Sequence, residues 1–145
     1  MSVEENEAVI RKVYAEFNKG NYDVIDECYT DNFVNYRASG NTQDREGFKQ
    51  FFLMMKDGFP DMQRTIQDLI VTEDRAALFF TWTGTDQWEY QGRTPTGKEI
   101  TVREIYFIRF DNGKISEYRQ YGDAYGMMFQ LGRLVDIERP ANEGE

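Results

Sequence analysis

A hairpin signal near the C-terminal end of the chain constrains the fold more than any other feature. Asp111-Asn112-Gly113 lies between two runs rich in aromatic and β-branched residues, and Asn-Gly at such a place favours a tight turn between antiparallel strands. We therefore expect strands over Glu99–Phe110 and Lys114–Tyr121. The other elements are organised around this pair.

Helical patterns dominate the first part of the chain, and strand patterns lead into the hairpin. Ser2–Glu5 has the spacing of a capping box, and Asn21 and Asp44 can cap two further helices. Helices followed by an antiparallel meander indicate an α+β fold rather than a βαβ chain. The expected elements are helices from Ser2 to Gly20, from Asn21 to Thr30 and from Asp44 to Gly58, a short strand at Phe33–Tyr36, a loop at Ala38–Gln43, strands over Met62–Thr72, Arg75–Asp86, Glu99–Phe110 and Lys114–Tyr121, and a helix over Ala124–Leu131.

Length and composition fit one globular unit. A chain of 145 residues suits a single domain, which we expect over residues 1–132, followed by an acidic, flexible tail over residues 133–145. Hydrophobic residues make up 40% and aromatic residues 15%, which excludes a disordered chain, and no apolar run is long enough to span a membrane. The acidic segment MSVEENEAVIRKVYAEF lacks the apolar core of a secretory signal, so we expect a cytoplasmic location.

Cysteine, histidine and net charge exclude several classes of function. Cys28 is the only cysteine, so no disulfide can form within the chain, and histidine, the commonest general base and metal ligand, is absent. We therefore expect chemistry by carboxylates, tyrosine, lysine or amides, with no metal and no cofactor. The net charge of −9 opposes binding to nucleic acid or to an anionic membrane.

Both faces of the expected sheet are apolar. Alternate side chains point to opposite faces of a strand, so Glu104 and Tyr106 share one face and Ile105 and Phe107 share the other. The helices can cover only one of these faces. A second copy of the chain is the simplest cover for the other face, so we expect a homodimer through the sheet.

Glu104 and Tyr106 are the candidate catalytic residues. A carboxylate that faces an apolar interior loses hydration, which raises its pKa and makes it a usable general acid or base near neutral pH. The alternatives are that Glu104 pairs with a neighbouring arginine and has a structural role, or that the two faces of the strand are assigned the wrong way round. Tyr106 can donate a hydrogen bond to a developing oxyanion, or it can simply line the pocket.

Five further residues are candidates for substrate binding. Asn35 and Gln120 can orient a carbonyl or hydroxyl group, or can make structural hydrogen bonds. Asp123 also has the position of a helix N-cap, and Asp86 that of a solvated loop carboxylate. Trp82 can stack on a flat substrate, although an aromatic residue in a strand also suits a core or a dimer interface.

The order of several short motifs resembles a known family. The pieces are FVNY from Phe33, FPD from Phe59, WTGTDQWEYQGRTPTGK from Trp82, IRFDNGKISEYRQYGD from Ile108 and YGMMFQLG from Tyr125. Together they resemble the SnoaL-like polyketide cyclase and ester-cyclase group, in the superfamily of scytalone dehydratase, ketosteroid isomerase and limonene-epoxide hydrolase. The resemblance implies a cone: a curved antiparallel or mixed sheet wrapped around helices, with an internal apolar pocket.

The resemblance also assigns positions in the pocket. Asn35 matches the family's asparagine, whereas Glu104 stands in place of its glutamine, Tyr106 in place of its histidine and Gln120 in place of its catalytic aspartate. Asp86 stands where many ester-cyclase-like sequences carry a histidine. Because an amide cannot transfer a proton in the required range, any catalysis has to depend on Glu104.

The sequence favours two functions over a third, a purely structural dimerisation module, because buried Asn, Glu and Gln cost stability unless something satisfies them. One is a cofactor-free acid/base enzyme, a cyclase or isomerase, that acts on a polyketide-like or other cyclic carbonyl compound. The other is a non-catalytic ligand-binding or sensing domain of the same fold, which would explain the loss of the family's aspartate and histidine.

Overall fold

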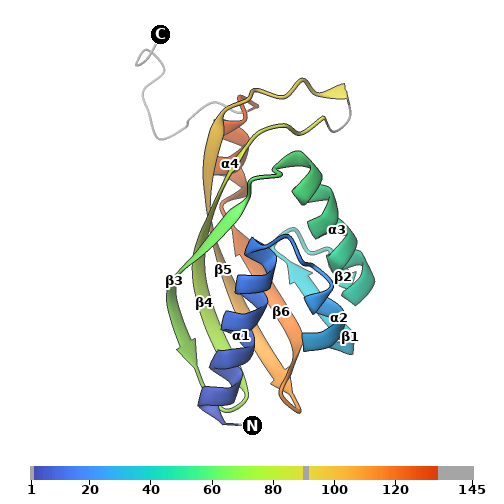
Figure 1. The fold of residues 1–145 in the computed structure, drawn as a ribbon, viewed down its shortest axis with the longest axis vertical. Coiled ribbons are helices and arrows are strands. Elements are labelled where there is room, and N and C mark those ends of the chain that lie inside the picture. The colour runs from blue at the N-terminus through green and yellow to red at the C-terminus, as the bar shows by residue number, and fades with distance from the viewer. Residues whose placement is uncertain (1, 90–91, 134–145) are drawn as a thin grey trace.

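The computed structural model describes residues 2–89 and 92–133 and has α+β architecture. A curved, six-stranded mixed sheet, open at both edges, carries helices on one face (Figure 1). The strand order is β2-β1-β6-β5-β4-β3, and β1 and β6 pair in parallel. The predicted fold class is confirmed. The elements are α1 (Val3–Asn18), α2 (Val24–Cys28), β1 (Tyr29–Arg37), β2 (Thr42–Asp44), α3 (Arg45–Gly58), β3 (Gln63–Val71), β4 (Arg75–Thr85), β5 (Glu99–Asp111), β6 (Lys114–Gly122) and α4 (Ala124–Gln130).

Local signals account for the turn and for three helix starts. Asn112 and Gly113 have φ of 49° and 77°, the left-handed conformations that match a two-residue hairpin to the twist of its strands. The side chains of Ser2, Asp44 and Asp123 accept backbone N–H groups at the starts of α1, α3 and α4. These predicted caps and the predicted hairpin are confirmed.

Three predictions in the first third of the chain are wrong. Asn21 does not cap α2: the N-cap is Asp23, and the Asn21 side chain accepts the Asp23 N–H instead, at 3.2 Å. The polar run Thr30-Asp31-Asn32, expected to stop a helix, lies within β1, in an irregular part of the strand between Tyr29 and Val34, which both pair with β6 from the other end of the chain. The expected loop Ala38–Gln43 includes the start of β2, which pairs with β1.

The helices cover the inner face of the sheet and leave the outer face open. Helices α1, α2 and α3 lie on one side (Figure 1), and the core between them and the strands is strongly aromatic. Its largest fully buried side chains include Phe17, Tyr29, Phe33, Phe48, Phe59, Phe80, Tyr106 and Tyr118. The alternation in β5 is as predicted, because Tyr106 is buried whereas Ile105 and Phe107 are exposed.

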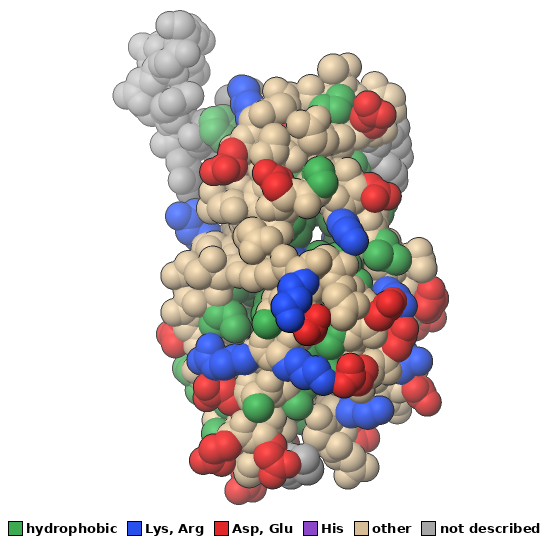
Figure 2. Space-filling view, viewed as in Figure 1, with side chains coloured by type: hydrophobic (Ala, Val, Ile, Leu, Met, Phe, Trp, Pro, Cys, Tyr) green, Lys and Arg blue, Asp and Glu red, His purple; other side chains and the backbone are tan. Residues whose placement is uncertain are grey.

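The surface over the helices is mixed in charge. Figure 2 shows Asp and Glu side chains spread around this face, with Lys and Arg among them and only small hydrophobic areas between. Within the described ranges, no helix is both long enough and apolar enough to cross a membrane. The predicted acidic tail lies outside the described residues, so the domain boundary at residue 132 remains a prediction.

Candidate functional site

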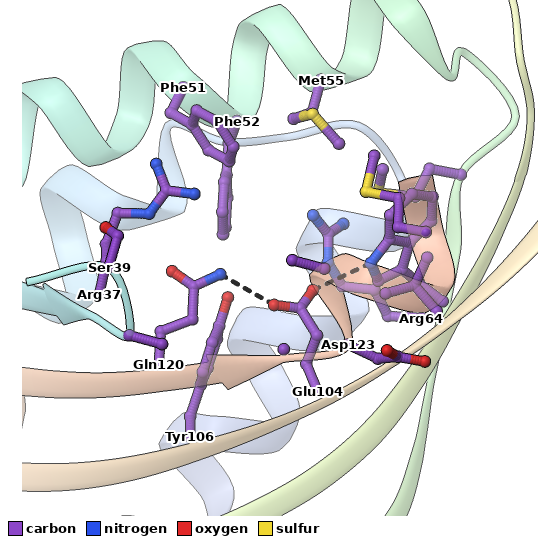
Figure 3. Close-up of a pocket in the computed structure, with 17 residues that line it drawn as sticks. Arg37, Ser39, Phe51, Phe52, Met55, Arg64, Glu104, Tyr106, Gln120 and Asp123 are labelled. Carbon is purple, nitrogen blue, oxygen red and sulfur yellow. Dashed lines mark hydrogen bonds between the residues drawn. The ribbon is translucent and has the colours of Figure 1, made fainter. Parts of the chain in front are cut away.

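A pocket of about 190 Å³ lies between the inner face of the sheet and α3, with α4 at one end (Figure 3). Its wall is largely apolar, with Phe51, Phe52 and Met55 from α3 and Met127 from α4. Its polar side chains come from the sheet, apart from Ser39 and Asp123, which lie just beyond the ends of strands. The lining therefore combines an apolar enclosure with a few convergent polar groups, which is typical of a small-molecule site.

The polar groups come from five successive strands of the sheet. Arg37 at the end of β1 pairs with Gln120 of β6, Gln120 pairs with Tyr106 of β5, and Glu104 of β5 pairs with Gly122. Trp82 of β4 and Arg64 of β3 are register partners further along the sheet. Because each of these residues sits at an inward position of its strand, the sheet brings together groups that are up to 83 positions apart in sequence.

Glu104 lies on the floor of the pocket and is held by two donors. Trp82 Nε1 donates to one carboxylate oxygen at 2.9 Å and Gln120 Nε2 donates to the other at 2.8 Å (Figure 3). Burial raises the pKa of the carboxyl group above its ordinary value, against the lowering effects of the Gln120 hydrogen bond and the Arg64 charge. The two donors thus orient Glu104, and burial shifts its pKa in the direction of neutral pH.

Gly122 gives the Glu104 carboxylate its room. The two residues are cross-strand partners, and a Cβ atom at position 122 would lie only 2.8 Å from a Glu104 carboxylate oxygen. A side chain at this position would displace the carboxylate. Because Gly122 has no side chain, β6 leaves the Glu104 carboxylate in its observed position.

Asn35 and Gln120 form a chain of amides behind Glu104. The Asn35 amide group donates to Gln120 Oε1 at 2.9 Å and to Gln43 Oε1 at 3.0 Å. Asn35 is fully buried and is not a lining residue, whereas Gln120 reaches the pocket. The structure therefore places Asn35 as a support for Gln120, and Gln120 as the group that contacts Glu104.

Tyr106 stands beside Glu104 on the same strand. Its ring is buried, and its hydroxyl points into the pocket between Gln120 and Glu104 (Figure 3). Burial, with the Glu104 charge second, raises the pKa of the phenol well above its ordinary value. Tyr106 therefore remains a protonated hydrogen-bond donor across the physiological range. Trp82, also buried, lines the pocket through the indole that holds Glu104.

Arg64 is a second buried charge in the pocket and was missed by the sequence analysis. Its guanidinium carbon lies 5.0 to 5.5 Å from the ring centres of Phe17, Tyr22 and Phe52. Each such contact stabilises a cation by about 0.5–2 kcal/mol, whereas burying an ion costs several kcal/mol. One Arg64 nitrogen donates to the Tyr22 hydroxyl at 3.0 Å. The signal was present in the sequence, since Arg64 lies two positions from Met62 and two from Ile66, and so shares their apolar face of the strand.

Asp123 and Asp86 lie differently from the residues above. Asp123 is at the pocket edge, but its exposed carboxylate accepts the Gly126 N–H at 2.8 Å as an N-cap. Asp86 is outside the pocket and fully buried, not solvated as expected for a loop. It forms an ion pair with Arg93 and accepts both the backbone N–H and the hydroxyl of Thr96.

The structure therefore brings Glu104, Tyr106, Gln120 and Trp82 together, with Asn35 behind them. Asp86 is separate and Asp123 is peripheral. In the described part of the chain, no group of three His, Cys, Asp or Glu residues is placed to hold a metal ion. The pocket's polar groups are those of acid/base chemistry and hydrogen bonding.

Comparisons with known proteins identify the family and agree with the fold. The family model of the SnoaL-like polyketide cyclases matches residues 8–131. AclR from Streptomyces galilaeus is 27% identical, with a TM-score of 0.85 over 93% of this chain and 89% of AclR. IdmH from Streptomyces antibioticus is 29% identical, with a TM-score of 0.78 over 88% of this chain and 98% of IdmH. A search of curated proteins finds no similar sequence.

Proposed function

Because this chain belongs to the SnoaL-like polyketide cyclase family, we propose that it binds a small cyclic carbonyl compound of polyketide type and catalyses a cofactor-free proton transfer on it. The reaction class is isomerisation or intramolecular cyclisation. The single observation that carries this proposal is the Glu104 carboxylate, held by Trp82 and Gln120 on the floor of an apolar pocket.

Each polar group has a role in such a reaction. Glu104 removes the proton from the carbon next to the carbonyl group, and the electron pair of that C–H bond moves into an enolate. Tyr106 donates a hydrogen bond to the oxyanion that forms. The proton on Glu104 then returns to a carbon or oxygen of the product. Gln120 keeps the carboxylate oriented throughout, and Asn35 keeps Gln120 in place.

Hydrogen exchange into a simple ketone tests the proposal without knowledge of the natural substrate. We expect the protein to speed the exchange of the α-protons of 1-tetralone or 2-tetralone in deuterated water, with saturation at high ketone concentration, as followed by proton NMR. Saturable binding of these ketones without exchange between pH 5 and pH 9 would instead favour a non-catalytic ligand-binding domain, the alternative left open by the sequence.

We also propose that two copies associate through the outer face of the sheet. Ile70, Ala77 and Phe107 are neighbours across β3, β4 and β5, and Phe79, Ile105 and Tyr121 form a second row beside them. Phe107 is 53% exposed and Ile70 is 64% exposed. A continuous apolar area on a face that no helix covers is typical of a subunit interface.

Replacing Phe107 with Asp is expected to weaken this association at least tenfold, because it places a charge at the centre of the apolar area. Sedimentation over a range of protein concentrations measures the effect. Gln50→Asp introduces the same residue at an exposed position of α3, on the side of the molecule that carries the helices, and should leave the association unchanged. A wild-type protein that stays monomeric at high concentration would contradict the proposal.

A further inference from the structure

Two arginines in the pocket lack the carboxylate partners that other arginines of this chain have. Within residues 2–89 and 92–133, neither Arg37 nor Arg64 forms an ion pair. Six other arginines do so, namely Arg11, Arg45, Arg75, Arg93, Arg109 and Arg119. Arg103 and Arg133 form no ion pair either, but of the four unpaired arginines in these ranges only Arg37 and Arg64 line the pocket.

Arg64 is the more constrained of the two. Its residue surface is only 7% exposed, its guanidinium group faces the cavity (Figure 3), and it has five N–H donors. The Tyr22 hydroxyl accepts one of them, and the three aromatic rings around the group contribute no acceptor. A buried guanidinium group with donors left over is a ready binding group for an anion.

Arg37 approaches the same cavity from the opposite edge of the sheet. Its guanidinium carbon lies 4.8 Å from the centre of the Phe51 ring, which orients the group beside α3. Both arginines lower the pKa of Glu104, so their fields reach the floor of the pocket. They converge with Glu104 on one space although they belong to strands at opposite sides of the sheet.

The acidic groups of the pocket do not cancel these two positive charges. Asp123 is exposed at the rim and caps α4, and Glu104 is bound to neutral donors rather than to either arginine. The chain as a whole carries a net charge of −9, which repels anions at long range. Inside the rim, the pocket therefore carries two arginines against one glutamate.

We propose that Arg64, assisted by Arg37, binds a carboxylate group of the ligand, so that the substrate class is an aromatic or polycyclic keto acid rather than a neutral ketone or ester. This inference deepens the proposed function, because it names the substrate class of the same pocket. The apolar wall holds the ring system, and the arginines fix the end that carries the carboxylate. The carbonyl group is then left to Tyr106 and the reacting carbon to Glu104.

Equilibrium binding of matched probes tests this inference independently of turnover. The probes are 2-naphthoate, which carries a carboxylate, and 2-naphthamide, which has the same ring system without the charge. Calorimetry, or the fluorescence of the tryptophans, measures both affinities. We expect the wild-type protein to bind 2-naphthoate at least tenfold more tightly than 2-naphthamide. Equal affinities, or a preference for the amide, would overturn the inference even if the protein exchanges ketone protons.

Three variants assign the preference to its source. Arg64→Met keeps much of the side-chain volume and is expected to weaken 2-naphthoate binding at least tenfold while changing 2-naphthamide binding less than threefold. Arg37→Met should weaken 2-naphthoate binding about threefold, because this side chain is more exposed. Arg103→Met removes one exposed positive charge from the outer side of β5 and should change neither affinity.

The test remains decisive if Arg64→Met does not fold. In that case, the ratio of the wild-type affinities for 2-naphthoate and 2-naphthamide, together with the effect of Arg37→Met on that ratio, tests the inference. A carboxylate preference that survives in both pocket variants would place the binding site for the anion elsewhere and overturn the inference. A preference without proton exchange would contradict the catalytic proposal and leave the carboxylate site standing.

Discussion

Replacing Glu104 with Gln is expected to lower the rate of ketone proton exchange by about 10²–10⁴-fold, the usual contribution of a positioned general base. Gln has the size of Glu and can still accept a hydrogen bond from the Trp82 indole or from Gln120, but it cannot take a proton. Ligand affinity and the folded structure should therefore change little. NMR exchange rates at saturating ketone measure the loss.

Glu99→Gln is the matched control, because it makes the same change at an exposed position of the same strand. It should keep the wild-type rate. A Glu104→Gln protein that retains more than half of the wild-type rate would exclude Glu104 as the proton-transfer group, whereas equal loss in both variants would point to a general effect of charge.

The same variant has a distinctive effect on stability as pH rises. The folded-state pKa of Glu104 lies above its ordinary value of 4.5, so below that value both folded and unfolded chains carry the proton and ionisation costs nothing. As pH rises from that value through the folded-state pKa, ionisation of Glu104 lowers the stability of the wild type, whereas the Gln variant has no charge to bury. The stability of Glu104→Gln relative to the wild type should therefore increase with pH, as measured by urea unfolding.

Replacing Arg93 with Met is expected to lower the free energy of unfolding by about 3 kcal/mol, because it leaves the Asp86 carboxylate buried without its cation. Arg93 donates to Asp86 Oδ1 at 2.8 Å and to the Trp88 carbonyl at 2.7 Å, and so ties together the segment after β4. The expected loss of about 3 kcal/mol is at the low end of the range for buried ion pairs, because the segment after β4 that covers Asp86 lies at the surface. Urea unfolding at pH 7 measures it.

The pH dependence and a double variant check the cause. The Arg93 guanidinium group lowers the pKa of Asp86 well below its ordinary value of 3.8, so the pair contributes its full stability above that value and loses it only as pH falls further. The difference between wild type and variant should be constant near neutrality and shrink in acid. Asp86→Asn combined with Arg93→Met should recover part of the loss, and Lys98→Met, at an exposed position nearby, should cause none. Full stability in Arg93→Met would show that the ion pair is dispensable.

Sequence reasoning was most successful where the signal was local. The hairpin follows from the left-handed conformations that Asn112 and Gly113 adopt readily. The N-caps at Ser2, Asp44 and Asp123 follow from short polar side chains placed before helical patterns. In each case the residues that decide the structure lie within about four positions of one another.

It was least successful where a residue's neighbours come from distant strands. Asp86 was expected in solvent because nothing in its own strand shows that Arg93 and Thr96 fold back over it. Thr30-Asp31-Asn32 looked like a helix stop, but this run lies in β1 between Tyr29 and Val34, which both pair with β6. Arg64 was overlooked because its position on the same face of the strand as the apolar residues Met62 and Ile66 was not considered.

The sequence alone determined the α+β class and that Glu104 and Tyr106 share one face of β5, because a period of two and a turn type are properties of neighbouring residues. Both faces of the strand are apolar, so the expectation that this face is the inner one depended on the resemblance to the SnoaL-like group. Only the tertiary structure decided that Trp82 and Gln120 hold the Glu104 carboxylate and that Arg64 faces the same space. Those relations depend on the register between strands that are far apart in the chain, and register is settled by the packing of the whole sheet.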